Sequence, residues 1–369
     1  MSLDFLILSQ IKKLESEAKE YERKGEKDKA YKIYEKIAYL YEEAASKASL
    51  QSTKELYLMK AREYRSKIRE AKEEVINGGE SDFTQIAKSM IEKTDITWDD
   101  ISGLDRVKSL IKQAIGIAVS KPEKPVKLDP PRAILLFGPP GTGKTMLAAA
   151  ASNSINSTFF NADISKVLSK YVGDSPKIID ALFSLARQMS PSIIFFDEFD
   201  AISVSREEKE SVSTGLLQKI LTEMDGFRKS RDFVMVIAST NRPWALDEAI
   251  VNRFDYRIYV PLPDFEARKG IFKLELEKKG FEIEADYDDL ARRTEGYSGR
   301  EIAQICRKAI MLMIKRMNPG IEDVKPGYKL KIGKITKEEL YASIESTKPS
   351  ISKELIKKYE EWNKEHGSE

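Results

Sequence analysis

The sequence predicts an α/β protein: a doubly wound parallel sheet, a small helical domain after it and a three-helix bundle before it. Residues 1–76 contain no proline and only Gly25, and their apolar residues recur at helical spacing. From about residue 98 to 260, short apolar runs alternate with helical stretches, as strands and helices do in parallel α/β folds. From residue 264 onward the pattern is mostly helical again.

The composition of the 369-residue chain excludes several kinds of site. The net charge of +2 argues against a dedicated nucleic-acid-binding protein, whose surface would be strongly basic. Cys306 is the one cysteine and His366 the one histidine, so internal disulfides, cysteine-based zinc sites and three-histidine metal sites are impossible. No run approaches the ~20 apolar residues that span a bilayer, and we therefore expect a cytoplasmic protein.

Three helices are expected in residues 1–76, each with one apolar stripe at alternating steps of four and three. Such stripes pack an antiparallel bundle. Alanines opposite tyrosines also leave room for a groove that binds a partner helix or extended peptide, so burial and docking both remain open. The stripes are Ile7, Ile11, Leu14, Ala18 and Tyr21; Ala30, Tyr34, Ile37, Tyr41, Ala44 and Ala48; and Tyr57, Ala61, Tyr64, Ile68, Ala71 and Val75.

Three further segments follow the bundle. Residues 77–93 are expected to form a flexible linker, because 77–82 read Asn-Gly-Gly-Glu-Ser-Asp without apolar periodicity. The large α/β domain is expected at 94–260, with strands in the apolar runs at 133–137, 159–160, 193–196, 233–238 and 258–260. The small helical domain is expected at 261–369, ending in an exposed, charged helix at 353–365.

A phosphate-binding loop lies between the first strand and the helix after it. Glycines in such a loop let backbone N–H groups surround phosphate oxygens, and the helix N-terminus adds partial positive charge. Lys144 is expected to reach the β and γ phosphates, and Thr145 to bind Mg²⁺ through its hydroxyl. The loop, which satisfies G-x-x-x-x-G-K-[ST], comprises Gly138, Pro139, Pro140, Gly141, Thr142, Gly143, Lys144 and Thr145.

Polar residues end two further strands. Asp197 and Glu198 follow the apolar run at 193–196, and Asn241 follows the run at 233–238. Because ligands bind at the carboxyl ends of parallel strands, we expect Asp197 to hold Mg²⁺ and Glu198 to polarise the water that attacks the γ phosphate. Asn241 is expected to orient that water. The alternatives are a solvated turn for the acidic pair and a helix or turn cap for Asn241.

These motifs resemble those of the AAA ATPases, and the resemblance covers about residues 94–365. Further matching strings are Trp98–Leu104, Asn241–Asp247 and Arg253-Phe254-Asp255. The resemblance implies that Asp100 and Gly103 lie against adenine, that Ser298 and Gly299 contribute to nucleotide binding, and that the cofactors are ATP and Mg²⁺.

Within this family the chain resembles the branch of the vacuolar-protein-sorting ATPase that disassembles ESCRT-III, to which katanin and spastin are related. The N-terminal bundle looks like a microtubule-interacting-and-transport (MIT) domain, and Arg257–Asp264, Gly296–Gly299 and the C-terminal Lys348–Trp362 match the branch. The likeness is greatest to the archaeal version that acts in cell division. It implies ESCRT-III-like filament proteins as partners, bound through their tails at the division site or at membrane necks, with only indirect membrane contact and no nucleic acid.

The resemblance also implies a ring, commonly a hexamer, in which a neighbour completes each active site. Arg253 falls where the family places its arginine finger, but Asn252 stands where relatives often have a second arginine. The alternative for Arg253 is an ordinary ion pair within its own chain. Lys170, Tyr171 and Val172 align with the loop that lines the central pore. Only residues 318–333 occupy the place of a β insertion that receives an activating cofactor in relatives.

Three functions are compatible with these residues. The first is an ATP-driven remodelling ring that pulls filament subunits into its pore. The second is another unfoldase or a microtubule-severing enzyme, although the chain has neither a longer linker nor a coiled coil. The third is a nucleotide-gated scaffold with little turnover, which the intact set of Lys144, Asp197, Glu198, Asn241 and Arg253 disfavours.

Overall fold

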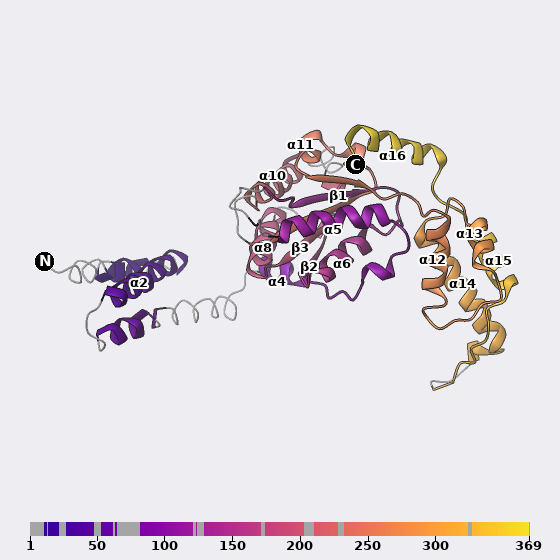
Figure 1. The fold of residues 1–369 in the computed structure, drawn as a ribbon, viewed down its shortest axis with the longest axis horizontal. Coiled ribbons are helices and arrows are strands. Elements are labelled where there is room, and N and C mark those ends of the chain that lie inside the picture. The colour runs from indigo at the N-terminus through magenta and orange to yellow at the C-terminus, as the bar shows by residue number, and fades with distance from the viewer. Residues whose placement is uncertain are drawn as a thin grey trace. The chain divides into compact units, whose positions relative to one another are not determined.

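The structure, a computed structural model, describes residues 11–21, 27–47, 53–64, 82–120, 123, 129–170, 174–202, 210–227, 232–323 and 327–368, without Lys13 and Arg62. The chain divides into two compact units, Met1–Asp82 and Phe83–Glu369. Figure 1 shows both, with uncertain residues in grey. Each unit is described by itself.

The first unit is helical throughout its described residues. Helical residues 11–21, α2 (Lys27–Lys47) and helical residues 53–64 pack through one apolar core. The rings of Tyr34 and Tyr64 lie 5.5 Å apart, and the Tyr64 hydroxyl donates a hydrogen bond to the Glu15 carboxylate. The described members of the three predicted stripes that form this core are Ile11, Ala18, Tyr34, Ile37, Tyr41, Ala44, Ala61 and Tyr64.

Five strands in the described residues of the second unit form one parallel sheet in the order β2-β3-β4-β1-β5. This order confirms the predicted doubly wound sheet. Phe137 pairs with Thr240 and Phe196 with Ala238, so the residues after β1, β3 and β4 emerge at one edge. The strands are β1 (Ala133–Phe137), β2 (Thr158–Asp163), β3 (Ser192–Asp197), β4 (Val234–Thr240) and β5 (Tyr256–Tyr259).

Helices cover both faces of this sheet because its strands are apolar on both sides. Alternate residues such as Ile134 and Leu136 face α5 (Asp105–Val119) and α6 (Lys144–Ser154). The intervening residues, such as Leu135, face α8 (Ser175–Gln188) and α10 (Glu210–Phe227). The short α7 (Ile164–Lys170) and α11 (Glu248–Val251) follow β2 and β4, and η1 (Trp98–Asp100) and η2 (Pro243–Ala245) are 3₁₀ turns.

A helical lid follows β5, as predicted. Its core joins four helices through side chains such as Phe272, Leu290, Ile305 and Leu340. The lid helices are α12 (Phe265–Glu275), α13 (Tyr287–Arg293), α14 (Gly299–Met317) and α15 (Lys337–Glu345), with the 3₁₀ turn η3 (Ile321–Asp323). Ser298 and Glu301 form a reciprocal capping box that begins α14.

The predicted linker at 77–93 is too long, because α4 (Asp82–Ser89) belongs to the second unit. Ala87 is buried in the sheet's core, and Ile91 forms an antiparallel bridge with Phe160 of β2. The apolar residues Phe83, Ile86, Ala87, Met90 and Ile91 recur at helical spacing. This short stripe is the signal that the linker prediction overlooked.

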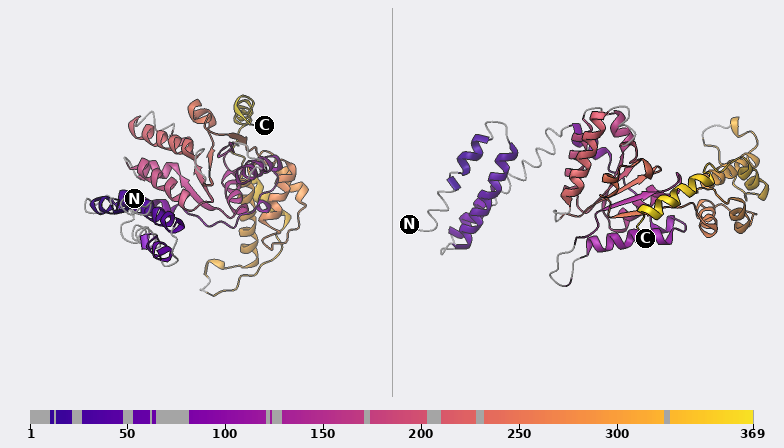
Figure 2. Two further views of the ribbon diagram at one scale, coloured as in Figure 1. Left: turned by 60° about the vertical axis from the view of Figure 1, so that its left-hand side comes forward. Right: turned by 90° about the horizontal axis from the view of Figure 1, so that it is seen from above.

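The predicted exposed helix at 353–365 is also wrong, because α16 (Lys353–His366) packs on the α/β domain through one apolar face. Tyr359 is 1% exposed, and the Trp362 ring lies 4.4 Å from that of Phe137. Figure 2 shows α16, in yellow, running from the lid back along the α/β domain. The small helical domain therefore ends before this helix.

Candidate functional site

A cavity of about 550 Å³ lies between the carboxyl edge of the sheet and the lid. This volume falls within the range of small-molecule sites, about 300–1,000 Å³. The predicted residues that line it are Asp100, Pro140, Gly141, Thr142, Gly143, Lys144, Thr145, Asp197, Glu198, Asn241 and Gly299. The fold thus brings residues from five separate segments together, three of which follow the adjacent strands β1, β3 and β4.

The phosphate loop has the backbone shape that its glycines allow. Gly141 and Gly143 have φ angles of +77° and +93°, a backbone conformation that is unfavourable for residues with a side chain. Gly138 admits no side chain, because a Cβ there would lie 2.2 Å from the Val260 carbonyl oxygen. The loop leads directly into α6, so its N–H groups and the helix N-terminus face the same cavity.

Lys144 is buried within this loop. Its ammonium donates hydrogen bonds to the carbonyl oxygens of Gly138 at 2.9 Å and Pro139 at 2.8 Å. Burial lowers the pKa of Lys144 to about 8, although Asp197 partly offsets this effect. The ammonium therefore lies where the oxygens of an incoming phosphate can replace the loop carbonyls as its hydrogen-bond partners.

Thr145 and Asp197 form a set of oxygen ligands at the edge of the sheet. The Thr145 hydroxyl donates to the Asp197 carboxylate at 3.3 Å, and the Ser239 hydroxyl donates to the other carboxylate oxygen. Hydroxyl and carboxylate oxygens are the ligands that Mg²⁺ takes beside nucleotide phosphates. The residues present therefore fit the predicted Mg²⁺, which would neutralise phosphate charge there.

Glu198 differs from Asp197 in its backbone conformation and in its hydrogen-bond partner. Its φ of +54° is unusual for a residue with a side chain and costs about 1–2 kcal/mol. Its carboxylate accepts a hydrogen bond from the Ser165 hydroxyl at 2.8 Å. Glu198 also lines the cavity, where a carboxylate can act as a general base toward a water molecule.

Asn241 presents a polar oxygen at the same edge. Its Oδ1 is buried and has no hydrogen-bond partner among the described residues. Its backbone carbonyl accepts a hydrogen bond from the hydroxyl of Tyr359 in α16. The strand and the C-terminal helix therefore hold the backbone of this residue, and its side-chain oxygen is a buried acceptor at the cavity's edge.

The lid supplies another side of the cavity, of which sequence reasoning predicted only Gly299. Ile271 and Leu274 of α12 and Ala303 of α14 line it with apolar atoms, which suit a nucleobase. Among the described residues of the lid, Arg300 of α14 is the one cation in this lining. Helical spacing on α12 and α14 was visible in the sequence, but it does not distinguish residues that face the lid core from those that face a cavity.

Several predicted residues lie outside the lining. Gly103 packs on the lid, since a Cβ there would lie 2.6 Å from that of Ala267, and Ser298 caps α14. Gly138 and Pro139 contribute only the carbonyls that hold Lys144. Arg253 forms an ion pair with Asp225 at 3.3 Å.

The predicted pore loop is barely represented in the structure. Lys170 is the last residue of α7. Tyr171 and Val172 lie outside the described residues.

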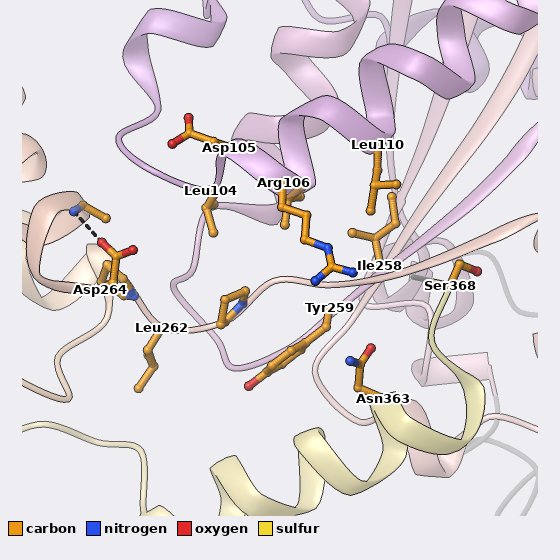
Figure 3. Close-up of a pocket in the computed structure, with 14 residues that line it drawn as sticks. Leu104, Asp105, Arg106, Leu110, Ile258, Tyr259, Leu262, Asp264, Asn363 and Ser368 are labelled. Atoms are coloured by element: carbon orange, nitrogen blue, oxygen red, sulfur yellow. Dashed lines mark hydrogen bonds between the residues drawn. The ribbon is translucent and has the colours of Figure 1, made fainter.

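A second cavity, of about 460 Å³, lies where α5, β5 and the start of α12 approach α16. Figure 3 shows Arg106 of α5 and Tyr259 of β5 directed into it, opposite Asn363 of α16. No residue of the phosphate loop lines it. The residues predicted to bind phosphate and Mg²⁺ therefore lie at the first cavity.

Comparisons with known proteins identify the class of protein that this fold and site define. Residues 134–262 match the ATPase family associated with various cellular activities (AAA), 284–325 match the AAA+ lid domain, and 317–367 match the Vps4 C-terminal oligomerisation domain. The chain therefore belongs to the AAA ATPases, in the branch of Vps4 and katanin. It is an ATP hydrolase, and the matched oligomerisation domain supports assembly into oligomers.

Individual relatives agree with this placement. The chain is 39% identical over 278 residues to the cell division cycle protein 48 homolog of Archaeoglobus fulgidus, covering 73% of this chain and 38% of that protein. It is 35% identical over 319 residues to vacuolar protein sorting-associated protein 4B of Mus musculus, covering 76% and 72% respectively. A structure solved to explain katanin self-assembly is 34% identical with a TM-score of 0.64, covering 76% of this chain and 96% of that one.

Proposed function

We propose that this ATPase disassembles ESCRT-III-like filaments. Its N-terminal bundle binds tails of filament subunits, and an oligomeric ring pulls the captured polypeptide into a central pore. The proposal places the protein in cell division or membrane scission. The observation that carries it is the alignment with Vps4B over 76% of this chain, joined to a match with the Vps4 oligomerisation domain.

The active site supports an enzyme rather than a passive scaffold. Lys144, Thr145 and Asp197 provide a phosphate-binding cation and Mg²⁺ ligands. Glu198 and Asn241 supply a general base and a polar oxygen at the same edge of the sheet. Each of these residues has the chemistry that in-line attack of water on a γ phosphate requires.

The surface of the bundle supports a docking role. The described tyrosine and alanine residues of the stripes pack in the core of the bundle. Leu56 and Met59, in contrast, are 49% and 58% exposed. These two residues are three positions apart and share one face of their helix. Apolar side chains of this kind bind the apolar face of a partner helix, so we propose that this face receives an amphipathic filament tail.

Deleting residues 1–76 separates recruitment from hydrolysis. We expect the shortened chain to lose binding to filament tails while its basal ATP turnover stays unchanged. Tail binding is measured by titrating labelled tail peptides, and Leu56→Glu in the full chain tests the docking face itself, with the exposed Lys54→Glu as its control. Unchanged tail binding after the deletion would contradict the proposed role of the bundle.

Tyr171→Ala tests the proposed pore. We expect it to retain ATP turnover and tail binding but to lose filament disassembly, because an aromatic side chain would grip the polypeptide without sequence preference. Filament loss is followed by sedimentation with the wild type beside it. Disassembly at the wild-type rate would contradict threading, and severing of microtubules in place of filaments would favour the katanin-like alternative.

A further inference from the structure

Asp200 is a buried carboxylate near the active site that does not itself line the nucleotide cavity. It lies three residues beyond the end of β3. One of its carboxylate oxygens accepts a hydrogen bond from the Thr240 hydroxyl at 2.8 Å, and the other accepts one from the Arg242 guanidinium at 2.9 Å. Both donors are direct neighbours of Asn241 in the sequence. One buried side chain therefore binds the residues on both sides of Asn241.

Further hydrogen bonds around this carboxylate hold the backbone at the end of β4. The Arg242 N–H donates to the Thr240 hydroxyl at 2.9 Å, so this hydroxyl accepts one hydrogen bond and donates another to Asp200. The Phe199 N–H donates to the Ser239 carbonyl at 2.9 Å, which joins the segment that carries Asp200 to β4. The turn that follows β4 therefore has defined partners before and after its central residue.

Asn241 depends on this support for the position of its side chain. Its buried Oδ1 has no hydrogen-bond partner among the described residues that would orient it. Its backbone carbonyl accepts a hydrogen bond from the Tyr359 hydroxyl. Burial raises the pKa of Tyr359, and the charges of Tyr259 and Asp200 raise it further, which favours the protonated hydroxyl as a donor. Backbone contacts and neighbouring residues thus set where the Asn241 side chain lies.

Stability alone does not account for a carboxylate at position 200. Taking a carboxylate out of water costs free energy, and a well-packed apolar residue is often at least as stabilising as a buried ion pair. The Arg242 side chain is 51% exposed, so its pair with Asp200 is partly screened by solvent. A role in placing the active-site residues explains why the charge is present.

We infer that Asp200 is a positioning residue for ATP hydrolysis, which acts through Thr240 and Arg242 to fix the turn that presents Asn241 to the attacking water. Only an ionised carboxylate accepts hydrogen bonds from both donors at once. An asparagine at this position would accept from one donor and direct its own N–H groups toward the other. This inference rests on the proposed role of Asn241 and is independent of the proposed filament substrate.

The test measures kcat and KM for ATP on the full chain for Asp200→Asn, Asn241→Ala and the double variant. Asp200→Asn keeps the side-chain shape but loses a charge-assisted hydrogen bond, so kcat falls by about tenfold or more. KM for ATP changes less than about twofold, because Asp200 lies outside the cavity. If Asp200 acts through Asn241, the double variant has the same kcat as Asn241→Ala alone.

Glu223→Gln is the matched control for loss of a buried, ion-paired carboxylate. The Glu223 side chain is 12% exposed against 9% for Asp200, and it pairs with Arg187 and Lys219 outside the cavity. Glu223→Gln lowers the melting temperature and leaves kcat unchanged.

A second pair of variants tests the same contact without changing Asp200. Thr240→Val removes the hydroxyl that donates to Asp200 and reproduces the fall in kcat, whereas Thr240→Ser keeps the hydroxyl and restores kcat. Wild-type kcat in both Asp200→Asn and Thr240→Val would overturn the inference.

The remaining outcomes separate Asp200 from Asn241. Wild-type kcat in Asn241→Ala alone would refute the role of Asn241 itself, and with it the inference. A double variant whose loss is the product of the two single losses, or equal falls of kcat in Asp200→Asn and Glu223→Gln, would overturn only the positioning role of Asp200.

Discussion

Two neighbouring carboxylates receive different surroundings at the tip of β3. Asp197 accepts hydrogen bonds from Thr145 and Ser239, which hold it at the end of the sheet beside the phosphate loop. Glu198 has a left-handed backbone and accepts a hydrogen bond from Ser165. We attribute metal binding to Asp197 and activation of water to Glu198 because only Asp197 shares a hydrogen bond with the loop hydroxyl.

Replacing Glu198 by glutamine tests this division of roles. Glu198→Gln removes the general base and keeps the side-chain shape, so ATP turnover is expected to fall by about 10²-fold or more. Binding of Mg²⁺ and ATP is expected to persist, whereas Lys144→Ala is expected to abolish it. Calorimetric titration and steady-state turnover measure the two properties. Turnover of Glu198→Gln at the wild-type rate would refute the role of Glu198.

Tyr359 gives a second prediction at the scale of single residues. Tyr359→Phe removes only the hydroxyl that donates to the Asn241 carbonyl, while its ring still packs against Trp244. Since one hydrogen bond contributes about 0.5–1.5 kcal/mol, we expect kcat to fall about two- to tenfold with KM for ATP unchanged.

The matched control is Tyr259→Phe, because the ring of Tyr259 stacks on that of Tyr359 at 6.1 Å. Its turnover is expected to match the wild type. An equal fall of kcat in both variants would mean that the turnover depends on aromatic packing and not on the position of Asn241.

At the scale of elements, Glu301 connects the start of α14 to the segment before α16. Its buried carboxylate accepts hydrogen bonds from the Ser298 backbone at 2.7 Å, the Ser298 hydroxyl at 2.9 Å and the Ser350 backbone at 2.8 Å. Burial alone would raise the pKa of Glu301, but these hydrogen bonds outweigh it and the pKa lies below its ordinary value of 4.5. The ionised carboxylate therefore stabilises the fold.

Glu301→Gln is expected to lower the free energy of unfolding by about 1–3 kcal/mol at pH 7. The carboxylate's contribution is complete above its unfolded-state pKa of 4.5 and is lost as the pH falls through the lower folded-state pKa. The difference between wild type and variant should therefore narrow below about pH 4.5. Urea unfolding from pH 3 to 7 measures it, with the exposed Glu345→Gln as control. A difference that does not change with pH would contradict this account.

The sequence predicted the catalytic edge of the sheet because its chemistry is local. The phosphate loop follows one apolar strand, and polar residues follow two other apolar strands. Because these strands, β1, β3 and β4, are adjacent and parallel, the residues that follow them lie close together. The lid side was not predictable in the same way, since Ile271 and Arg300 carry no motif of their own. Helix α16 was misjudged because its many charges conceal one stripe, formed by Leu355, Tyr359 and Trp362.

At the scale of the whole molecule, the surroundings of Arg253 bear on the prediction that a neighbouring subunit completes each active site. It follows α11 and lies outside the cavity of its own chain, where its guanidinium pairs with Asp225. The two side chains are 45% and 51% exposed, so this ion pair contributes only about 0–1 kcal/mol. We propose that Arg253 exchanges this weak pair for the nucleotide of a neighbouring subunit, where it stabilises charge on the transferring phosphoryl group.

The most direct test of this claim is steady-state ATP turnover per chain, measured against chain concentration for the wild type, Arg253→Ala and Asp225→Asn. If neighbours complete each site, turnover per chain should rise with concentration, fall at least about 10³-fold in Arg253→Ala and persist in Asp225→Asn. Near-wild-type turnover in Arg253→Ala, or equal losses in the two variants, would show that Arg253 serves only its own chain and would contradict the account.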